Sequence, residues 1–451
     1  MSAAGKSPQR SPAVERPGLL SRQVAAKLLA AVVDGRTSLD GLLDLRGGHP
    51  GYRALEPRDQ GLVRAILLAS LRHRGTIERA LAGRLERPLP GNAAALRHLL
   101  HAAAAQVLFL DVPDSAAVDL AVAAAEADPR NRRFKGLVNA LLRRLSREKA
   151  KIAPKPSENL PPWLRERLAA AYGAAAADAI ARAHGVPPPL DLTVKSDPDG
   201  WASRLGGTKL ATGTVRLAAL DGPLPELPGF ADGEWWVQDA GAALPALLFG
   251  DLRNKRALDL CAAPGGKTAQ LALAGARVTA LDASERRMTR LRENLARLRL
   301  DVETLVADAA SYAPAEPFDA VLLDAPCSST GTIRRHPDVP YTKDAAEVAK
   351  LAEVQARLLK AASRMVAPGG RLVFSNCSVL PEEGEAVAAE FLQRHPEFRL
   401  QPIGDGEVPG LGGAVSAEGF LRTLPSMLPN EADPRLAGLD GFFAARFVRH
   451  S

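Results

Sequence analysis

The sequence predicts three folded parts: an all-α N-terminal domain, a small α+β domain and a C-terminal α/β domain built on a parallel, doubly wound sheet. Apolar residues recur at helical spacing between residues 20 and 148, where no β-type alternation is found. From residue 238 onward, continuous apolar strands alternate with amphipathic helices, which is typical of a parallel sheet covered on both faces. The length of 451 residues is that of about three ordinary domains.

The helical domain is predicted over residues 19–148, behind a polar and basic tail, residues 1–18, that we expect to be disordered. Asp59 is expected to cap a helix that runs to Leu71. Another helix is predicted over 93–110, and a last one from Phe134 to Arg147. The apolar face of that last helix is predicted to be Leu137, Val138, Leu141, Leu142 and Leu145.

Basic residues are concentrated at the front of the chain. Residues 1–150 hold 24 Lys and Arg against 14 Asp and Glu, a net charge of +10. The remainder holds 34 against 37, a net charge of −3. One interpretation of this charge is that residues 1–150 bind a polyanionic partner. The other is that they form only a solvated basic surface. Residues of this front that could contact phosphates are Arg130, Arg132, Arg133, Lys135, Arg143, Arg144 and Arg147.

The three cysteines do not form a disulfide framework, and free thiols favour a reducing compartment. Residues 1–20 lack the apolar segment of a secretory signal. An apolar run of about 18 residues is also missing, so we expect no membrane span and a cytoplasmic protein.

Residues 149–236 are predicted to be a linker followed by a small α+β lead-in domain. The linker, 149–160, is rich in Lys, Pro and Ser, and a helix follows from residue 161 to about residue 184. Short extended pieces are expected at 190–194, 215–220 and 234–237. This region contains no pattern that identifies chemistry.

The last domain, residues 237–451, is predicted to hold the ligand site beyond the carboxyl ends of its strands. Strands are expected at 256–261, 277–281, 302–306, 319–323 and 371–375. Each cysteine follows one of these apolar runs, and Cys377 is the expected nucleophile. The residues expected at the carboxyl ends of the strands are Cys261, Gly265, Asp282, Asp308, Asp324, Cys327 and Cys377.

The loop Ala262–Lys267 combines small residues with two glycines, which lets its backbone approach a ligand at a helix N-terminus. Asp282 suits a ribose diol, and Asp308 suits a polar edge such as an adenine amino group. Neighbouring carboxylates would tolerate a cationic sulfonium, which favours S-adenosylmethionine over NAD. The spacing alone fits any nucleotide on such a sheet, and either aspartate could instead cap a helix.

Three longer strings, residues 261–268, 324–331 and 376–383, resemble the RNA cytosine-5 methyltransferase family, the NOL1/NOP2/Sun group. They lie in the family's order, and the resemblance covers about 238–448. Residues 440–446 are similar to the family's closing strand. The resemblance implies a Rossmann-like class I methyltransferase domain.

The helical domain has a resemblance of its own. Residues 106–118 and 135–144 look like the NusB-type RNA-binding domain, and Arg58-Asp59 and Leu71-Arg72 fit the same pattern. Together the two parts resemble bacterial enzymes of the Sun/Fmu type, which methylate carbon 5 of cytosine in 16S ribosomal RNA. The resemblance implies an RNA partner, either 16S rRNA or an assembling small subunit. We expect a monomer without a metal site.

By position, the resemblance also implies roles for individual residues. The thiolate of Cys377 would add to carbon 6 of a flipped cytosine, and carbon 5 would take the methyl group. Cys327 would assist release, while Asp324 and Lys267 would hold the base. The residues implied to contact S-adenosylmethionine are Cys261, Ala262, Ala263, Pro264, Gly265, Gly266, Lys267, Asp282, Arg287, Asp308 and Asp324.

Two departures from the family pattern are Asn376, where Thr is usual, and Gly384, where Asn is frequent. The loop 401–420 is also expected to be particular to this chain. One alternative is a DNA cytosine-5 methyltransferase, in which Cys327 would be the nucleophile. Another is a non-catalytic RNA-binding or ribosome-assembly factor on a methyltransferase fold. The basic helical domain disfavours a small-molecule methyltransferase.

Overall fold

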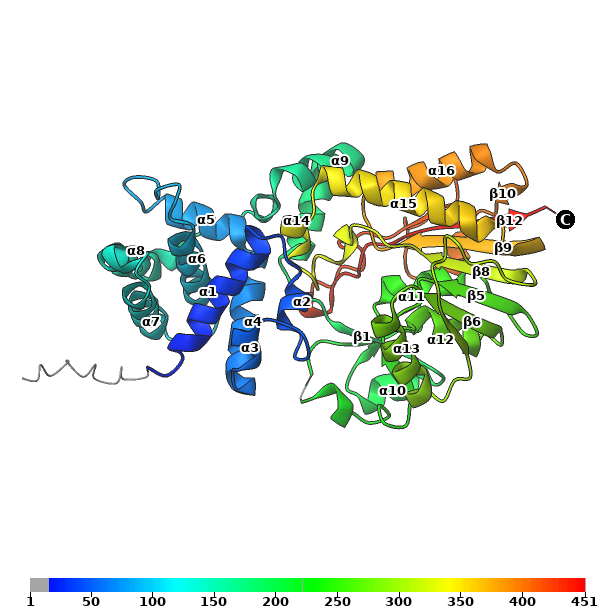
Figure 1. The fold of residues 1–451 in the computed structure, drawn as a ribbon, viewed down its shortest axis with the longest axis horizontal. Helices are drawn as coiled ribbons and strands as arrows, with labels where there is room; N and C mark the ends of the chain where they lie inside the picture. Colours follow the sequence, from blue (N-terminus) through cyan, green and yellow to red (C-terminus); the bar gives the residue numbers. More distant parts are fainter. Residues whose placement is uncertain (1–15, 221, 451) are drawn as a thin grey trace, which may run out of the picture. The chain divides into compact units, whose positions relative to one another are not determined.

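The computed structural model describes residues 16–220 and 222–450 and divides the chain into two compact units, Met1–Lys155 and Pro156–Ser451 (Figure 1). Most of the predicted tail, residues 1–18, lies outside the described residues. None of the described helices has the length and apolar character needed to cross a membrane.

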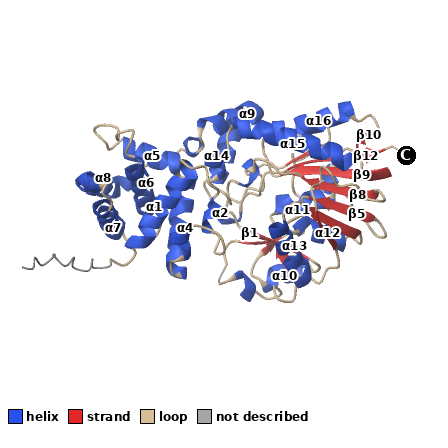
Figure 2. Ribbon diagram, viewed as in Figure 1, coloured by secondary structure: helices blue, strands red, loops and turns tan. Residues whose placement is uncertain are grey.

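The first unit is helical throughout its described part, as predicted (Figure 2). Its core contains Ile77, Leu96, Leu100 and Leu142, none of which is exposed to solvent. The helices are α1 (Leu19–Val33), α2 (Leu39–Leu43), α3 (Pro50–Arg53), α4 (Pro57–Arg72), α5 (Arg74–Ala82), α6 (Ala94–Phe109), α7 (Asp114–Ala127) and α8 (Lys135–Glu148).

Two details of this unit differ from the prediction. Asp59 does not cap α4, because the helix begins at Pro57 after Glu56. Its carboxylate instead accepts a hydrogen bond from Ser21 Oγ on α1 at 2.9 Å. Leu137 is 36% exposed, since α8 buries only the face that carries the other predicted apolar residues.

The second unit opens with a helical segment and a small antiparallel sheet in the order β2-β3-β1-β4. Helix α9 (Pro162–His184) is interrupted at Gly173, whose φ of 80° departs from helical geometry. Helix α10 (Pro198–Arg204) follows β1. The strands are β1 (Leu190–Val194), β2 (Thr208–Lys209), β3 (Val215–Leu217) and β4 (Trp235–Val237). This arrangement confirms the small α+β lead-in.

The large sheet has the strand order β10-β12-β9-β8-β5-β6-β7, with β11 paired to β12. Strands β5 to β9 are parallel, as predicted, whereas β12 is antiparallel to both β9 and β10, so the sheet as a whole is mixed. Its strands are β5 (Arg256–Leu260), β6 (Arg277–Asp282), β7 (Glu303–Val306), β8 (Phe318–Asp324), β9 (Val366–Asn376), β10 (Phe398–Leu400), β11 (Leu421–Arg422) and β12 (Phe443–Arg449).

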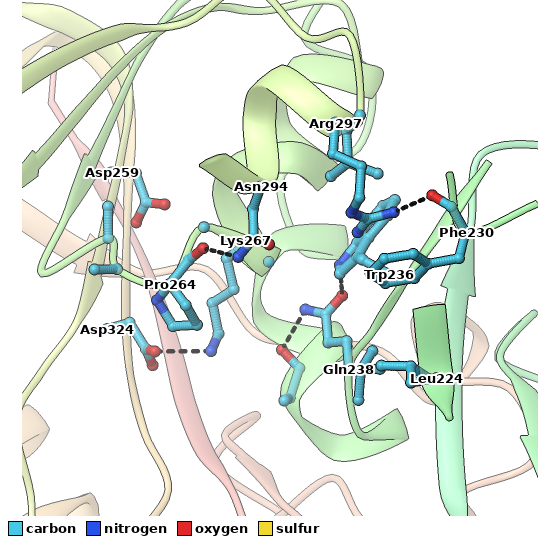
Figure 3. Close-up of a pocket in the computed structure, with 17 residues that line it drawn as sticks. Leu224, Phe230, Trp236, Gln238, Asp259, Pro264, Lys267, Asn294, Arg297 and Asp324 are labelled. Carbon is cyan, nitrogen blue, oxygen red and sulfur yellow. Dashed lines mark hydrogen bonds and ion pairs between the residues drawn. The ribbon is translucent and has the colours of Figure 1, made fainter. Parts of the chain in front are cut away.

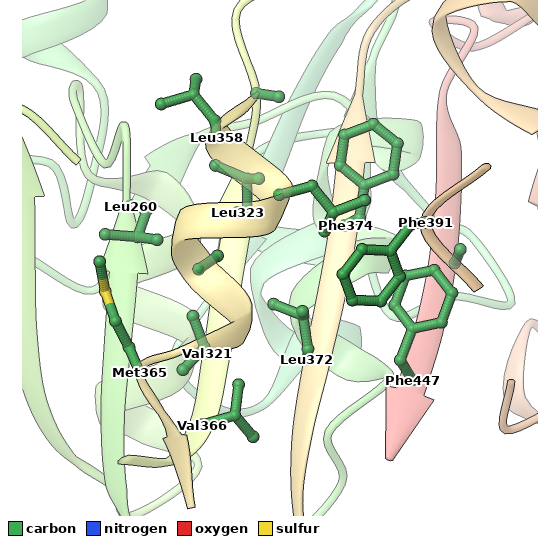
Figure 4. Packing of buried hydrophobic residues seen from close by; sticks show 14 of the residues in the cluster. Leu260, Val321, Leu323, Leu358, Met365, Val366, Leu372, Phe374, Phe391 and Phe447 are labelled. Atoms are coloured by element: carbon green, nitrogen blue, oxygen red, sulfur yellow. The ribbon is translucent and has the colours of Figure 1, made fainter. Parts of the chain in front are cut away.

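Alternating side chains of the central strands face two different helical layers, because successive residues of a strand point to opposite faces. Leu258 and Leu323 pack under α15 and α16, the cluster shown in Figure 4. Ala257 and Leu322 pack against α11 and α12. The helices of the two layers and the connecting helix α14 are α11 (Ala240–Leu247), α12 (Gly266–Leu273), α13 (Glu285–Arg297), α14 (Val339–Thr342), α15 (Ala345–Ser363) and α16 (Glu385–Arg394). This layering confirms the predicted Rossmann-like fold.

Candidate active site

The loop between β5 and α12 turns sharply at Gly265, whose φ is +102°. A Cβ atom at this position would lie 3.1 Å from Leu291 of α13, so glycine suits both the turn and the packing. The next residue, Gly266, begins α12. The backbone of residues 262–267 is therefore held close to the N-terminus of a helix, where an anionic or polar group is favoured.

A cavity of about 390 Å³ lies beside this loop (Figure 3). All the predicted residues from Ala262 to Lys267 line it, together with Asp324. Cys261, Asp282, Arg287 and Asp308 do not line this cavity. Lining residues that the sequence analysis did not single out are Leu224, Phe230, Trp236, Val237, Gln238, Ala242, Asp259, Asn294, Arg297 and Leu298.

Asp282 and Arg287 contact the back of the same loop. Asp282 Oδ2 lies 3.1 Å from Arg287 Nη2 and accepts a hydrogen bond from Ala263 N at 3.3 Å. Arg287 Nη2 also donates to the Ala263 carbonyl at 2.9 Å. Asp308 is exposed just beyond the end of β7, and Ala307 N donates to the Asp282 carbonyl at 3.2 Å. These predicted residues thus follow the ends of neighbouring strands, outside the cavity.

Asp259 is a fully buried carboxyl group inside β5 and a lining residue of the cavity. Its Oδ2 accepts a hydrogen bond from Thr268 Oγ1 at 2.6 Å, while its Oδ1 has no hydrogen-bond partner. Burial raises the pKa of Asp259 to about 7. Asp259 was not predicted as a site residue because it lies within the apolar strand β5. Its charge among apolar neighbours was the only feature of the sequence that could have identified it.

Cys261 is a largely buried thiol surrounded by carboxylates. Burial, followed by the neighbouring carboxylates of Asp282 and Asp324, raises the pKa of Cys261 to about 12. The thiol therefore stays protonated at neutral pH, which suits a packing role better than a reactive one.

Lys267 and Asp324 form an ion pair at the carboxyl end of β8. Lys267 Nζ donates to Asp324 Oδ2 at 2.8 Å, and Ser375 Oγ donates to Asp324 Oδ1 at 2.8 Å. The Lys267 ammonium also lies 4.9 Å from the centre of the Phe442 ring. Both predicted residues are therefore fixed in orientation, and their polar groups face one another (Figure 3).

The structure brings Cys327 and Cys377 together, with their Sγ atoms 3.4 Å apart. The hydrogen bond from Cys327 lowers the pKa of Cys377, although burial opposes this. The same contact, together with burial, raises the pKa of Cys327 well above its ordinary value. The contact therefore acts on the two thiols in opposite directions and favours ionisation of Cys377 over that of Cys327.

The two departures from the family pattern have structural explanations. Asn376 donates from Nδ2 to the Glu383 carbonyl at 2.6 Å and accepts from Ser378 N at 3.0 Å, so its amide holds the turn that carries Cys377. A Cβ atom at position 384 would lie 2.7 Å from the Phe443 ring and 2.5 Å from Arg422 Nη2. Glycine is therefore the residue that this packing accommodates.

Comparison with known proteins places the chain in a family. A profile described as "16S rRNA methyltransferase RsmB/F" matches residues 247–448, and one described as "NusB family" matches residues 20–147. The "Ribosomal RNA small subunit methyltransferase B" of Xanthomonas campestris is 39% identical over 430 residues, which cover 90% of this chain and 97% of that protein. This chain belongs to the 16S rRNA methyltransferase RsmB/F family.

Solved structures agree with the fold of this RsmB/F-family protein. The protein PH0851 aligns with a TM-score of 0.71 at 22% identity, covering 96% of this chain and 99% of that one. A "Methyltransferase Homolog Protein" from Pyrococcus horikoshii aligns with a TM-score of 0.52 at 25% identity, covering 64% of this chain and 100% of that one.

In the NusB-like unit, seven basic residues were predicted to contact phosphates. Most of them form ion pairs with neighbouring Asp or Glu side chains. Pairs with nitrogen–oxygen distances of 2.8 to 3.5 Å are Arg130–Asp128, Lys135–Glu126, Arg143–Asp119 and Arg144–Glu148. Such exposed pairs are weak and can be exchanged for phosphate contacts at little cost. The arginine at position 133 instead lies over the Phe134 ring, 4.7 Å from its centre.

Proposed function

We propose that this protein methylates carbon 5 of cytosine in RNA, with S-adenosylmethionine as methyl donor and Cys377 as covalent nucleophile. The observation that carries the proposal is the contact between the two thiols, whose Sγ atoms lie 3.4 Å apart. This contact lowers the pKa of Cys377 and raises that of Cys327. Carbon 5 of cytosine is a poor nucleophile, and addition of a thiolate to carbon 6 makes it reactive. The two adjacent thiols provide a nucleophile, Cys377, and a second group, Cys327, to assist its release.

The residues of the donor loop fit S-adenosylmethionine chemically. The backbone of 262–267 borders a cavity that also contains the buried carboxyl of Asp259, one oxygen of which lacks a partner. Asp282 and Asp308 follow the adjacent strands, where carboxylates suit ribose hydroxyls and a purine amino group. We assign donor binding to Cys261, Ala262, Ala263, Pro264, Gly265, Gly266, Lys267, Asp282, Arg287, Asp308 and Asp324. When bound, S-adenosylmethionine supplies the electrophilic methyl group.

In the proposed mechanism, the Cys377 thiolate forms a bond to carbon 6 of a cytosine that has left its stack. Asp324, held by Lys267 and Ser375, hydrogen-bonds the Watson–Crick edge of the base and shares a proton at N3 as negative charge develops. Carbon 5 then takes the methyl group. Carbon 5 then loses its proton to bulk water, and the electron pair of that bond re-forms the double bond between carbons 5 and 6. The bond between carbon 6 and sulfur breaks at the same time, Cys377 leaves as a thiolate, and Cys327 assists this release.

The proposed substrate is 16S ribosomal RNA, either free or in an assembling small subunit. Relatives such as the X. campestris protein, named "Ribosomal RNA small subunit methyltransferase B", support this choice. The net charge of +10 on residues 1–150 gives the helical unit the sign needed to attract phosphates. A single-stranded or loop nucleotide is favoured, because base extrusion costs least there.

The test uses single cysteine variants with RNA that contains 5-fluorocytosine. We expect Cys377→Ala to form no covalent adduct on a denaturing gel, because it lacks the nucleophile, whereas Cys327→Ala accumulates one. Cys261→Ala keeps both thiols of the pair and the backbone of the donor loop, so it should still form the adduct. The reverse pattern for Cys327 and Cys377 would favour chemistry of the DNA cytosine-5 methyltransferase type. Tight rRNA binding without methyl transfer from labelled donor would favour a non-catalytic assembly factor.

A further inference from the structure

Glu383 lies behind the two cysteine loops in the short 3₁₀ helix η6 (Pro381–Glu383), and its side chain is fully buried. Its Oε1 accepts hydrogen bonds from Ser328 N at 2.8 Å and from Gln355 Nε2 at 3.1 Å. Its Oε2 accepts one from Ser328 Oγ at 2.5 Å. Both carboxylate oxygens are thus bound to the residue that directly follows Cys327.

The main chain of Glu383 is bound to the other cysteine loop. Its carbonyl accepts the hydrogen bond from Asn376 Nδ2, and Asn376 directly precedes Cys377. Gln355 extends the same network, because its Nε2 also donates to the Pro326 carbonyl at 3.0 Å. One buried residue therefore contacts the neighbours of both thiols.

Three side-chain hydroxyl groups also link the loop of Cys327 to the loop of Cys377. Ser328 Oγ lies 3.1 Å from Thr330 Oγ1 and 3.3 Å from Ser378 Oγ, and the last two oxygens are 3.0 Å apart. Each of these side chains is fully buried. A buried polar network of this kind is rigid when all its members are satisfied and loses much of that rigidity when a central acceptor is removed.

We propose that Glu383 is a positioning residue that holds the Cys327 loop in register with Cys377, so that Cys327 can act on the covalent intermediate. The inference rests on the proposed cytosine-5 chemistry. It predicts that substitution of Glu383 impairs release of the product by Cys327 more than formation of the covalent bond by Cys377. Any substitution at 383 keeps the main-chain carbonyl that binds Asn376, so the loop of Cys377 stays in place. The side-chain contacts with Ser328 and Gln355 are lost, and with them the placement of the Cys327 loop.

The experiment compares Glu383→Ala with Glu383→Gln and with the matched control Glu382→Ala. Glu382 is the preceding residue of the same 3₁₀ helix, but its side chain is 42% exposed and pairs with Arg167 on α9. Methyl transfer to unmodified RNA, covalent adduct on denaturing gels and donor affinity are measured for each protein, together with the thermal midpoint.

We expect Glu383→Ala to lower the rate of methyl turnover by about 100-fold, the scale of a misplacement of roughly 1 Å. Adduct should accumulate on unmodified RNA, as for Cys327→Ala, and the dissociation constant of the donor should stay within about twofold. Glu383→Gln keeps one acceptor oxygen and should recover part of the turnover, to within about tenfold of wild type. Glu382→Ala should match wild type in every measurement.

Two results would overturn the positioning role. One is a Glu383→Ala protein whose turnover and adduct level equal those of Glu382→Ala. The other is a parallel loss of donor binding, adduct formation and turnover in both Glu383 variants, which would show that the residue only maintains the fold. If wild-type protein forms no adduct with 5-fluorocytosine RNA and transfers no methyl group, the proposed function itself fails, and this outcome is distinct from the other two.

Discussion

Asp259 shows how one residue couples the donor site to pH. The pKa of its carboxyl group is about 7 in the folded protein, because the group is buried, whereas an aspartate in an unfolded chain has a pKa near 3.9. Between these values the folded state binds a proton that the unfolded state lacks. The contribution of this residue to stability is therefore fully present below about pH 4 and is lost as the pH rises to about 7.

We predict that Asp259→Asn removes this pH dependence. Over the window from pH 5 to 7, the free energy of unfolding of wild type should fall more steeply with pH than that of the variant, by up to about 1.4 kcal/mol per pH unit. Urea denaturation at several pH values measures the two slopes. Asp251→Asn, at an exposed carboxylate, serves as the control and should keep the wild-type slope in this window. Equal slopes for Asp259→Asn and wild type would contradict the assigned ionisation.

Part of the candidate site was predictable from the sequence. The motifs identified Asp324 and the two adjacent cysteines, because each lies at or just after the end of an apolar strand, and Lys267, because it lies in the glycine-rich loop that leads into α12. Asp259 could not be assigned from the sequence, since its unpaired oxygen depends on how β5 packs against α12. The contacts of Glu383 with Ser328 likewise join residues 55 positions apart, and only the folded chain brings them together.

At the scale of helices and strands, local patterns predicted the parallel strands β5 to β9, because each is a run of apolar residues between loops. They did not predict that β12 runs antiparallel to β9, since strand direction is decided by tertiary pairing. The break in α9 at Gly173 was also missed. In the small sheet, Asp191 of β1 and Arg216 of β3 form a buried ion pair at 2.7 Å, which no local pattern indicates.

This pair supports a prediction about how the small sheet is attached. Asp191 Oδ2 also accepts a hydrogen bond from Ala240 N, which starts α11, so the residue connects two strands and a helix. Asp191→Ala should lower the free energy of unfolding by about 3–5 kcal/mol, because it leaves the arginine at 216 buried without its carboxylate. Chemical denaturation measures the change. Asp199→Ala, which breaks the exposed pair with Lys209, should cost less than about 1 kcal/mol. Similar losses in the two variants would contradict this role.

For the whole molecule, charge and chemistry are divided between the two units. The helical unit, whose residues 1–150 carry a net charge of +10, has no thiol. All three cysteines lie in the second unit, and residues 151–451 carry −3. Electrostatic attraction to a phosphate backbone acts over long range and is independent of sequence. The proposed covalent step, by contrast, would depend on Cys377 and on its contact with Cys327. Affinity for RNA and chemistry on the base should therefore respond to different substitutions.

The last prediction separates these two contributions. Arg133 and Arg147 are exposed in the helical unit, and the double variant Arg133→Glu/Arg147→Glu should weaken RNA binding by about tenfold or more while leaving donor affinity unchanged. If both arginines contact single-stranded phosphates, losing them should reduce the slope of log affinity against log salt by about 1.4. Fluorescence anisotropy over a salt series gives both quantities. Arg253→Glu, an exposed position in the second unit, is the control and should change the RNA affinity less than twofold. An equal loss in the two proteins would mean that overall charge, rather than the helical unit, determines how RNA is bound.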